Sequence, residues 1–307
     1  MRAACCEATV LRNEVIAPDI RLLTVVWPDR DHAPHAGQFF TLRAWGADEA
    51  PFLSRPISVH RWNPDSSTIE FLYQVVGEGT EKIAQLKMKD TFQLTGPMGN
   101  GFDVPDILSK YKKIAVVGGG IGTAPMFQLT RELAAAGVKP DVFFGFRDAP
   151  YCMEEYREIA NLVKVSTDTG AVGFHGFVTQ LYDPADYDVV LVCGPTVMMK
   201  NAARLCAEKH TPCFVSLEKK GAQAAEHVRK PDLELFLRLQ EAAHGLVRLI
   251  TIAPETDGAK EFIRRLADQG PCVMIGRCAD YILAGRPDVV RVFVHADKDF
   301  CLEQAMK

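Results

Sequence analysis

A glycine-rich segment at residues 118–125, Gly-Gly-Gly-Ile-Gly-Thr-Ala-Pro, holds the residue types that bind phosphate. The apolar residues 114–117 before it are typical of a buried parallel strand, and Pro125 suits the first turn of a helix. Glycines at such a turn let the backbone approach a ligand, and the helix N-terminus offers it N–H groups. Pro125 stands where the dinucleotide fingerprint has a third Gly or Ala, so the match is a variant. We predict a pyrophosphate-binding loop, with a plain strand–helix turn as the alternative.

Residues 55–58, Arg-Pro-Ile-Ser, precede a second candidate phosphate turn at residues 75–80, Val-Val-Gly-Glu-Gly-Thr. An arginine on an extended strand can bind phosphate through two nitrogens, while backbone groups of the strand reach a flavin ring. Gly77 and Gly79 precede a predicted helix whose N–H groups suit a pyrophosphate, with Thr80 as the cap. The alternative is a surface ion pair and ordinary turns. The order of these motifs, ahead of residues 118–125, favours cofactor binding.

Residues 5–103 carry the pattern of a small antiparallel β-barrel. Segments rich in Val, Ile, Leu, Phe and Thr recur between turn residues, as in all-β domains. These segments are residues 9–16, 21–27, 38–45, 57–62, 68–76 and 91–94. Short strands at such spacing favour a barrel, which a helix at residues 80–86 interrupts.

Residues 112–217 alternate between strand and helix patterns, which is typical of a parallel sheet covered on both faces. Strands are predicted at residues 114–117, 141–144, 164–166, 189–193 and 213–216. Helices are predicted at residues 125–136, 153–160, 176–181 and 197–208. A shorter α/β pattern follows, with one of its strands at residues 249–253. We therefore divide the chain into residues 1–105, 106–218 and 219–307.

The composition excludes several classes of partner. The chain has 307 residues and a formal net charge of −4 at pH 7, which favours neither nucleic acid nor an anionic membrane. No apolar run approaches the length of a membrane span, and the first residues lack the core of a secretory signal, so we expect a cytoplasmic protein. The nine cysteines include no Cys-x-x-Cys pair, so we expect reduced thiols and no metal site.

The first seven-tenths of the chain, residues 1–218, resemble the ferredoxin reductase-like flavoprotein superfamily. Within it, the chain looks most like the electron transfer subunits of NAD-dependent dihydroorotate dehydrogenase. The motifs that carry the resemblance are residues 55–58, 73–80, 96–102, 118–125 and 193–195. The resemblance implies a β plus α/β fold, an FAD-binding antiparallel β-barrel followed by a parallel-sheet NAD-binding domain. It also implies electron transfer from NAD(P)H through FAD to a partner, in pyrimidine biosynthesis.

The resemblance also implies which residues bind the cofactors. The flavin and its phosphates would be lined by Arg55, Pro56, Ile57 and Ser58, and the FAD pyrophosphate would be held by Gly79 and Thr80. The NAD pyrophosphate would face Gly119, Gly120, Gly122 and Thr123, and the nicotinamide would lie near Cys193, Gly194 and Pro195. For Cys193 the alternative is a small buried core thiol. Hydride transfer needs no side-chain acid or base, so we assign no catalytic residue, and we expect His60 and His175 to be structural or surface residues.

Asp168 follows the third predicted strand of the α/β region. A carboxylate near the adenosine ribose accepts its hydroxyls and repels a 2′-phosphate, which favours NAD over NADP. The alternative is a turn aspartate before Gly170. Arg147 nearby weakens the preference for NAD, since an arginine can pair with the extra phosphate.

The chain departs from the family that it resembles after residues 214–217. There the family has a cysteine cluster that binds a 2Fe–2S centre. This chain has no cysteine between Cys213 and Cys272, so we expect no 2Fe–2S centre. A catalytic dehydrogenase subunit is the expected electron acceptor.

Residues 270–283 and 292–297 resemble the middle of a cytidylate kinase-like domain. Such kinases need Gly-x-x-x-x-Gly-Lys-[Ser/Thr], which residues 254–260, Pro-Glu-Thr-Asp-Gly-Ala-Lys, do not match. We therefore expect a non-catalytic fragment in residues 219–307. The alternatives to an oxidoreductase are a nucleotide kinase-related protein that acts through this segment, and a non-catalytic nucleotide-binding subunit.

Overall fold

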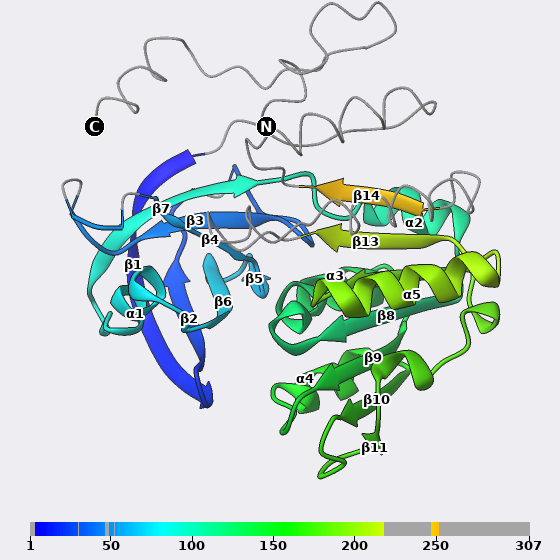
Figure 1. The fold of residues 1–307 in the computed structure, drawn as a ribbon. Helices are drawn as coiled ribbons and strands as arrows, with labels where there is room; N and C mark the ends of the chain where they lie inside the picture. The colour runs from blue at the N-terminus through cyan, green and yellow to red at the C-terminus, as the bar shows by residue number, and fades with distance from the viewer. Residues whose placement is uncertain (1–3, 30, 47–48, 52, 218–246, 252–307) are drawn as a thin grey trace, which may run out of the picture.

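The fold consists of two seven-stranded sheets, one antiparallel and one parallel. The structure is a computed structural model that describes residues 4–29, 31–46, 49–51, 53–217 and 247–251. In Figure 1 the antiparallel sheet, in blue and cyan, lies beside the parallel sheet, in green and yellow. The predicted fold class, a β half followed by an α/β half, is confirmed. The domain boundaries at residues 105 and 218 stay predictions.

The antiparallel sheet has the strand order β4-β3-β7-β1-β2-β6-β5. Its strands are β1 (Ala4–Ala17), β2 (Ile20–Val26), β3 (Phe39–Arg43), β4 (Arg55–Ser58), β5 (Arg61–Asn63), β6 (Thr68–Gln74) and β7 (Thr91–Met98). Register shifts in β1 after Val10 and after Val15 bend this long strand, and such irregularities help a sheet to curl. Helix α1 (Glu78–Ala84) follows β6.

Residues 57–62 were predicted as one strand, and this prediction is wrong because the chain changes partners there. Strand β4 pairs with β3, whereas β5 pairs with β6. Between them, the Val59 N–H donates to the Gln38 carbonyl and the His60 N–H donates to the Glu70 carbonyl. Residues 59 and 60 therefore carry the chain from one side of the curled sheet to the other.

The concave side of the antiparallel sheet encloses an aromatic core. Trp27, Phe40 and Phe71 are fully buried, and Phe40 meets the other two rings edge to face, with ring centroids 4.9 and 5.7 Å apart. Aliphatic side chains from β1, β2 and β7 complete this cluster. Alternation of buried and partly exposed residues along β3 and the first half of β6 follows from the period of two in a strand, while Leu72 of β6 is buried on the other face against the parallel half.

The parallel sheet has the strand order β11-β10-β9-β8-β12-β13-β14. Its strands are β8 (Ile114–Gly119), β9 (Asp141–Phe146), β10 (Leu162–Thr167), β11 (Phe174–His175), β12 (Val189–Cys193), β13 (Cys213–Leu217) and β14 (Val247–Thr251). The helices are α2 (Val104–Lys110), α3 (Ala124–Ala135), α4 (Met153–Ile159) and α5 (Thr196–Glu208), with 3₁₀ turns η1 (Gly120–Thr123), η2 (Val178–Gln180) and η3 (Pro184–Asp186). Helices α2, α3 and α4 share a core on one face, and α5 packs on the other.

Strand β8 is the point at which the parallel sheet changes direction. The chain proceeds from β8 outward to β9 and β10, then returns to place β12 on the other side of β8. Loops that leave two such neighbouring strands diverge, and ligands of open α/β sheets bind in the crevice between them. The candidate phosphate loop and the segment 193–195 follow these two strands.

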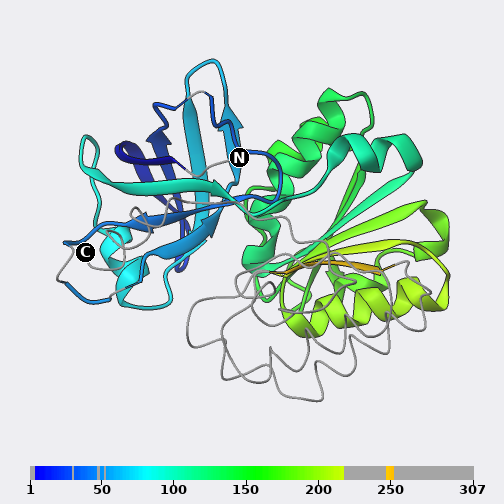
Figure 2. The ribbon, with the colours of Figure 1, turned by 90° about the horizontal axis from the view of Figure 1, so that it is seen from above.

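Helix α3 joins the two halves through polar side chains, of which Gln128 is buried and Arg131 and Glu132 are partly buried. Figure 2 shows the two halves side by side. The Gln128 side chain accepts a hydrogen bond of 2.9 Å from the Trp62 backbone, and Arg131 donates to the Trp62 carbonyl at 2.8 Å. Glu132 accepts from the Ala36 N–H at 2.8 Å, and burial raises the pKa of its carboxyl. These contacts satisfy backbone groups of β5 and of the segment before β3 in the antiparallel half.

Two further differences from the predicted elements have local causes. Residues 176–181 were predicted as a helix, but they form only η2, where the Gln180 side chain accepts from the Phe177 N–H. Helix α2 was not predicted, although Asp103 caps it through the Asp106 N–H and a proline lies in its first turn. Of the predicted elements after residue 218, only the strand near 249–253 falls on described residues, as β14.

Replacement of Phe40 by alanine tests the aromatic core. We expect Phe40→Ala to lower the free energy of unfolding of the antiparallel half by about 3–5 kcal/mol, because it leaves a cavity between two rings. All three tryptophans of the chain, Trp27, Trp45 and Trp62, lie in this half, so their fluorescence during urea denaturation reports on it. Val15→Ala, at a side chain 66% exposed on β1, is the control and should change little. Equal effects of both would contradict the assigned core.

Candidate functional site

The segment 118–125 forms a short, internally bonded turn between β8 and α3. Its glycines do not lead directly into the helix, because η1 intervenes as a 3₁₀ turn. The Thr123 hydroxyl donates to the Gly120 carbonyl at 2.9 Å, and Gly120 has φ of 54°, a value that favours glycine. Pro125 lies in the first turn of α3, as predicted. The loop therefore has a defined shape before any ligand contacts it.

The turn after β8 and the turn after β12 touch backbone to backbone. A Cβ on Gly122 would lie 2.4 Å from the Gly194 Cα and 2.7 Å from the Cys193 carbonyl oxygen. A Cβ on Gly119 would lie 2.4 Å from the Met198 sulfur and 3.0 Å from Pro195. The structure thus brings both predicted NAD-binding segments together where β8 and β12 are neighbours.

Cys193 occupies the end of β12, paired with Gly118. Its side chain is buried in the core that β8 and β12 share with helices α3 and α4. The side chain of Cys193 is therefore a small buried thiol, which is the alternative given for it from the sequence. Only its backbone faces the glycine turn, where the carbonyl lies close to Gly122.

Tyr156 of α4 supports the glycine turn from behind, and sequence reasoning missed it. Its hydroxyl donates to the Thr123 carbonyl at 2.7 Å, and the ring is buried between Phe127 and Phe144. Burial raises the pKa of this phenol well above its ordinary value, so it stays a donor. No local pattern marks Tyr156, because its role depends on how α4 packs against η1.

Arg55 lies directly over the second glycine turn. A Cβ on Gly79 would stand 2.2 Å from the Arg55 Nε and 3.0 Å from its Cδ, so a side chain at this position would displace the arginine from the turn. The Arg55 guanidinium is also 5.9 Å from the centre of the Trp45 ring, which limits where it can point. The structure therefore joins two motifs that the sequence separates.

Thr80 shapes this turn, but it is not the helix cap that was predicted. Gly77 is the N-cap, and Thr80 is the third residue of α1. The Thr80 hydroxyl accepts from the N–H groups of Val76 and Gly77, at 2.9 and 3.1 Å, and donates to the Gly77 carbonyl at 2.8 Å. Its side chain is thus committed to the loop.

Strand β4 presents the remaining predicted flavin-binding residues at an end of the antiparallel sheet. Residues 55–57 are partly buried and Ser58 is buried. Pro56 stands opposite Thr41 and Ile57 opposite Phe40 in the pairing with β3. Because β4 is the end strand of its sheet, its second edge faces away from β3.

The glycine loop that follows β8 packs against the antiparallel half. Ile121 and Ala124 of the glycine loop pack with Leu72 of β6 and Ile20 of β2. Strand β6 leads into the turn at residues 77–79. The loop that follows β8 therefore borders the same sheet that carries Arg55.

Asp168 and Arg147 lie at the carboxyl edge of the parallel sheet. The Asp168 N–H is shared between the carbonyls of Phe146 and Arg147, each at 3.1 Å. Both side chains are exposed. These positions are compatible with both predictions, a contact of Asp168 with the adenosine ribose and a contact of Arg147 with the 2′-phosphate of NADP.

A curled antiparallel sheet, followed by a parallel sheet with a glycine turn at its switch point, defines the class of ferredoxin reductase-like flavoproteins. The solved NADH-dependent reduced ferredoxin-NADP oxidoreductase has a TM-score of 0.58 and 26% identity, over 69% of this chain and 76% of that one. The ferredoxin NADP⁺ reductase of Neisseria gonorrhoeae, at 17% identity, shows the same fold, with a TM-score of 0.56 over 67% of this chain and 91% of that one.

The chain belongs to the family of dihydroorotate dehydrogenase B (NAD(+)) electron transfer subunits. It is 43% identical to the subunit of Clostridium acetobutylicum over 186 residues, which are 61% of this chain and 72% of that one. It is 40% identical to the subunit of Clostridium perfringens, over 60% of this chain and 72% of that one. Membership of this family makes the chain an oxidoreductase of the electron transfer type.

The C-terminal segment has a separate relationship. Residues 226–307 match the model of the cytidylate kinase-like family. This match confirms the resemblance seen in the sequence, and it falls almost wholly outside the described residues. Among the described residues, no helix has both the length and the apolar character needed to cross a membrane.

Gly122→Ala tests the contact between the two turns. We expect it to destabilise the parallel half by about 1–3 kcal/mol, because the new Cβ overlaps the backbone at Gly194 and neither segment can yield freely. Gly77→Ala is the matched control, since that glycine is extended and nothing lies within 4 Å of its Cβ position. Thermal unfolding followed by circular dichroism measures both. Equal stability of the two variants would show that the turns do not touch.

Proposed function

We propose that this chain carries electrons from NADH through a bound FAD to a catalytic dehydrogenase subunit. The observation that supports this proposal most strongly is the presence of two glycine turns, one in contact with Arg55 in the antiparallel half and one against Gly194 in the parallel half. The family relationship supports electron transfer between a nicotinamide nucleotide and a catalytic subunit, because the relatives are named as electron transfer subunits of a dehydrogenase that uses NAD(+). That name makes NAD(+) the electron acceptor in the relatives, so the carrier works there in the reverse direction.

The residues around Arg55 fit a flavin nucleotide. The Arg55 side chain lies against Gly79, which has no side chain of its own, so a pyrophosphate can contact the guanidinium nitrogens and the backbone of the turn together. The end strand β4 offers backbone groups and the side chains of Ile57 and Ser58 beside it. FAD, when bound, supplies the redox chemistry by taking a hydride from NADH and releasing its electrons to an acceptor.

The turn after β8 fits the pyrophosphate of the nicotinamide nucleotide. Gly120 is partly exposed and nothing lies within 4 Å of its Cβ position, so a ligand can approach the backbone there, while Gly119 and Gly122 pack against residues 193–198. Cys193 and Gly194 border this turn, so the nicotinamide end of the ligand would lie towards β12 and the antiparallel half. The protein's role is to bind, to orient and to exclude water, so we assign no acid or base.

We propose further that the chain prefers NADH and holds no 2Fe–2S centre. Asp168 is exposed at the carboxyl end of β10, which supports a role at the adenosine ribose, where a carboxylate would repel a 2′-phosphate. The 58 residues between Cys213 and Cys272 contain no thiolate ligand for a cluster. Electrons would then pass from the flavin to the partner without a cluster in this chain.

The match at residues 226–307 raises kinase activity as a second candidate function. Its sequence argues against catalysis, because residues 254–260 lack the second glycine and the hydroxyl residue of a phosphate-binding loop. We therefore propose that this segment does not transfer phosphate.

The purified full chain should show the absorption of an oxidised flavin, and NADH should bleach it under anaerobic conditions. Arg55→Ala should weaken FAD binding about tenfold or more, because it removes a charged phosphate contact. Arg12→Ala, at an exposed arginine on β1, is the control and should retain FAD. A colourless chain that FAD does not reconstitute would exclude the proposal. Iron analysis of the same sample should find no stoichiometric iron.

Asp168→Ser tests the choice of nucleotide. We expect the KM for NADH to rise about tenfold and the KM for NADPH to fall, because the substitution removes a ribose acceptor and a negative charge. Steady-state reduction of a dye by each nucleotide measures both values. Asp186→Ser, at an exposed carboxylate in η3 at the other end of β12, is the control. If the ratio of the KM for NADH to the KM for NADPH is the same in Asp168→Ser as in the wild-type chain, Asp168 is only a turn residue before Gly170.

A further inference from the structure

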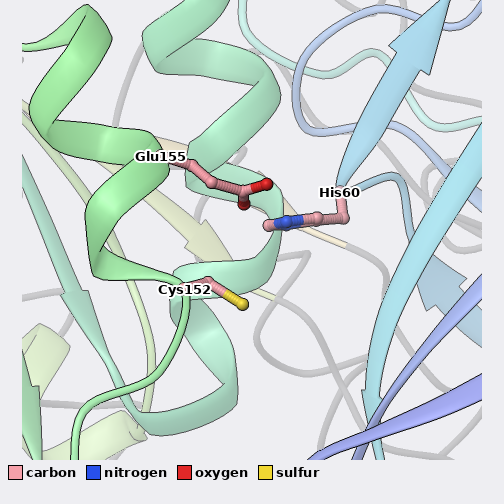
Figure 3. A group of neighbouring side chains, drawn as sticks. All are labelled: His60, Cys152 and Glu155. Carbon is pink, nitrogen blue, oxygen red and sulfur yellow. The ribbon is translucent and has the colours of Figure 1, made fainter.

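Three side chains that can bind a metal converge at the joint between the two halves (Figure 3). His60 follows β4 in the antiparallel half, and Cys152 and Glu155 lie at the start of α4 in the parallel half. The His60 ring nitrogen, the Cys152 sulfur and a Glu155 carboxylate oxygen all lie within 4.8 Å of one another. The spacing of these residues in the sequence does not suggest a metal site, and none was predicted.

The His60 ring is held with one nitrogen aimed into this group. Its Nδ1 is 2.8 Å from the Ala124 carbonyl, which only accepts, so Nδ1 carries the proton and Nε2 has a lone pair. His60 is fully buried, and Nε2 has no hydrogen-bond partner among the described residues. A buried polar atom without a partner is costly, which calls for an explanation at this position.

The surroundings of His60 favour a ligand rather than a charged imidazole. The ring stacks on Phe127, with centroids 4.9 Å apart and planes 25° apart. Burial lowers the pKa of His60 to about 4, so the imidazole is neutral near pH 7. A neutral imidazole whose other nitrogen donates to a carbonyl is the usual form of a metal-binding histidine.

The other two side chains, the Glu155 carboxylate and the Cys152 thiol, suit a divalent ion such as zinc. Glu155 is half-exposed and forms an ion pair of 2.5 Å with Arg61, which in turn lies 3.2 Å from Glu70. That ion pair accounts for the Glu155 carboxylate, but it leaves Nε2 without a partner. Burial raises the pKa of the Cys152 thiol to about 11, so a metal ion would have to displace its proton.

We propose that His60, Cys152 and Glu155 bind one divalent transition metal ion, Zn²⁺ by ligand type, that fastens the two halves together. Imidazole nitrogen, thiolate and carboxylate are ordinary zinc ligands, and a water molecule completes four-coordination. The thiolate and the carboxylate neutralise the charge of the ion. Tetrahedral zinc needs ligand atoms roughly 3.3–3.8 Å apart, so the side chains must close by about 1 Å from their present separation.

The site is distinct from the proposed cofactor site and borders it. Ala124, which holds the His60 ring, follows the last residue of the glycine turn. Tyr156, next to Glu155, bonds the carbonyl of Thr123 in the same turn. A metal ion here would therefore hold the glycine turn against the antiparallel half, whether or not a nucleotide is bound.

Cobalt titration of the metal-depleted full chain tests this proposal. One equivalent of Co²⁺ should bind per chain and give a thiolate-to-cobalt absorption band. Addition of Zn²⁺ should displace the cobalt and remove this band. Cys152→Ser should remove that equivalent and its band, and Glu155→Gln should weaken it about tenfold or more. Cys6→Ser is the matched control, because Cys6 is also partly buried with its thiol pKa raised to about 11. All variants keep Cys272, Cys278 and Cys301, so any cobalt that these cysteines bind is the same in every titration.

Zn²⁺ should also raise the melting temperature of the wild-type chain and of Cys6→Ser, but not that of Cys152→Ser. Equal cobalt binding by Cys152→Ser and Cys6→Ser would overturn the proposal and assign the metal to other groups. If Cys152→Ser does not fold, Glu155→Gln decides the question, because its side chain is half-exposed. An unchanged cobalt affinity in that variant would equally overturn it.

Discussion

The contact between Gly122 and Gly194 is the constraint on which the candidate site depends. Strands β8 and β12 are neighbours, so the turns that follow them begin about one strand spacing apart. A side chain on either glycine would push the turns apart, since the Cβ position at Gly122 lies 2.4 Å from the facing backbone. With both side chains absent, the two turns form one continuous backbone surface at the place where the sheet changes direction.

The second requirement is that the antiparallel half keeps a fixed position against this surface. Helix α3 meets it by placing Gln128, Arg131 and Glu132 on backbone groups of residues 36 and 62. These bonds are directional and largely withdrawn from water, so they hold the halves in one register more firmly than apolar contact alone. The buried His60 belongs to the same joint, and its unpartnered nitrogen is the exception among these satisfied polar groups.

Much of the fold followed from patterns that act over a few residues. Residues 189–193 were predicted as a strand and form β12 with those bounds, and the helix at 125–136 differs from α3 by one residue at each end. The predictions were wrong where a pairing strand or a hydrogen-bond partner elsewhere in the chain decided the local structure. Residues 57–62 split because β4 and β5 pair with different strands, and Thr80 left the cap position because its hydroxyl bonds the preceding loop. Backbone pairing across the sheet carries no local signal.

The sequence by itself determined the two glycine turns, the strand that carries Arg55 and the proline that begins α3, because glycine and proline restrict or free the backbone at their own positions. The tertiary structure alone decided that Arg55 lies on Gly79, that Tyr156 holds the glycine turn, and that His60 meets Cys152 and Glu155. Each of these contacts joins residues far apart in the chain. The first two form when each half folds and buries its apolar face, and the third forms only when the halves dock through α3.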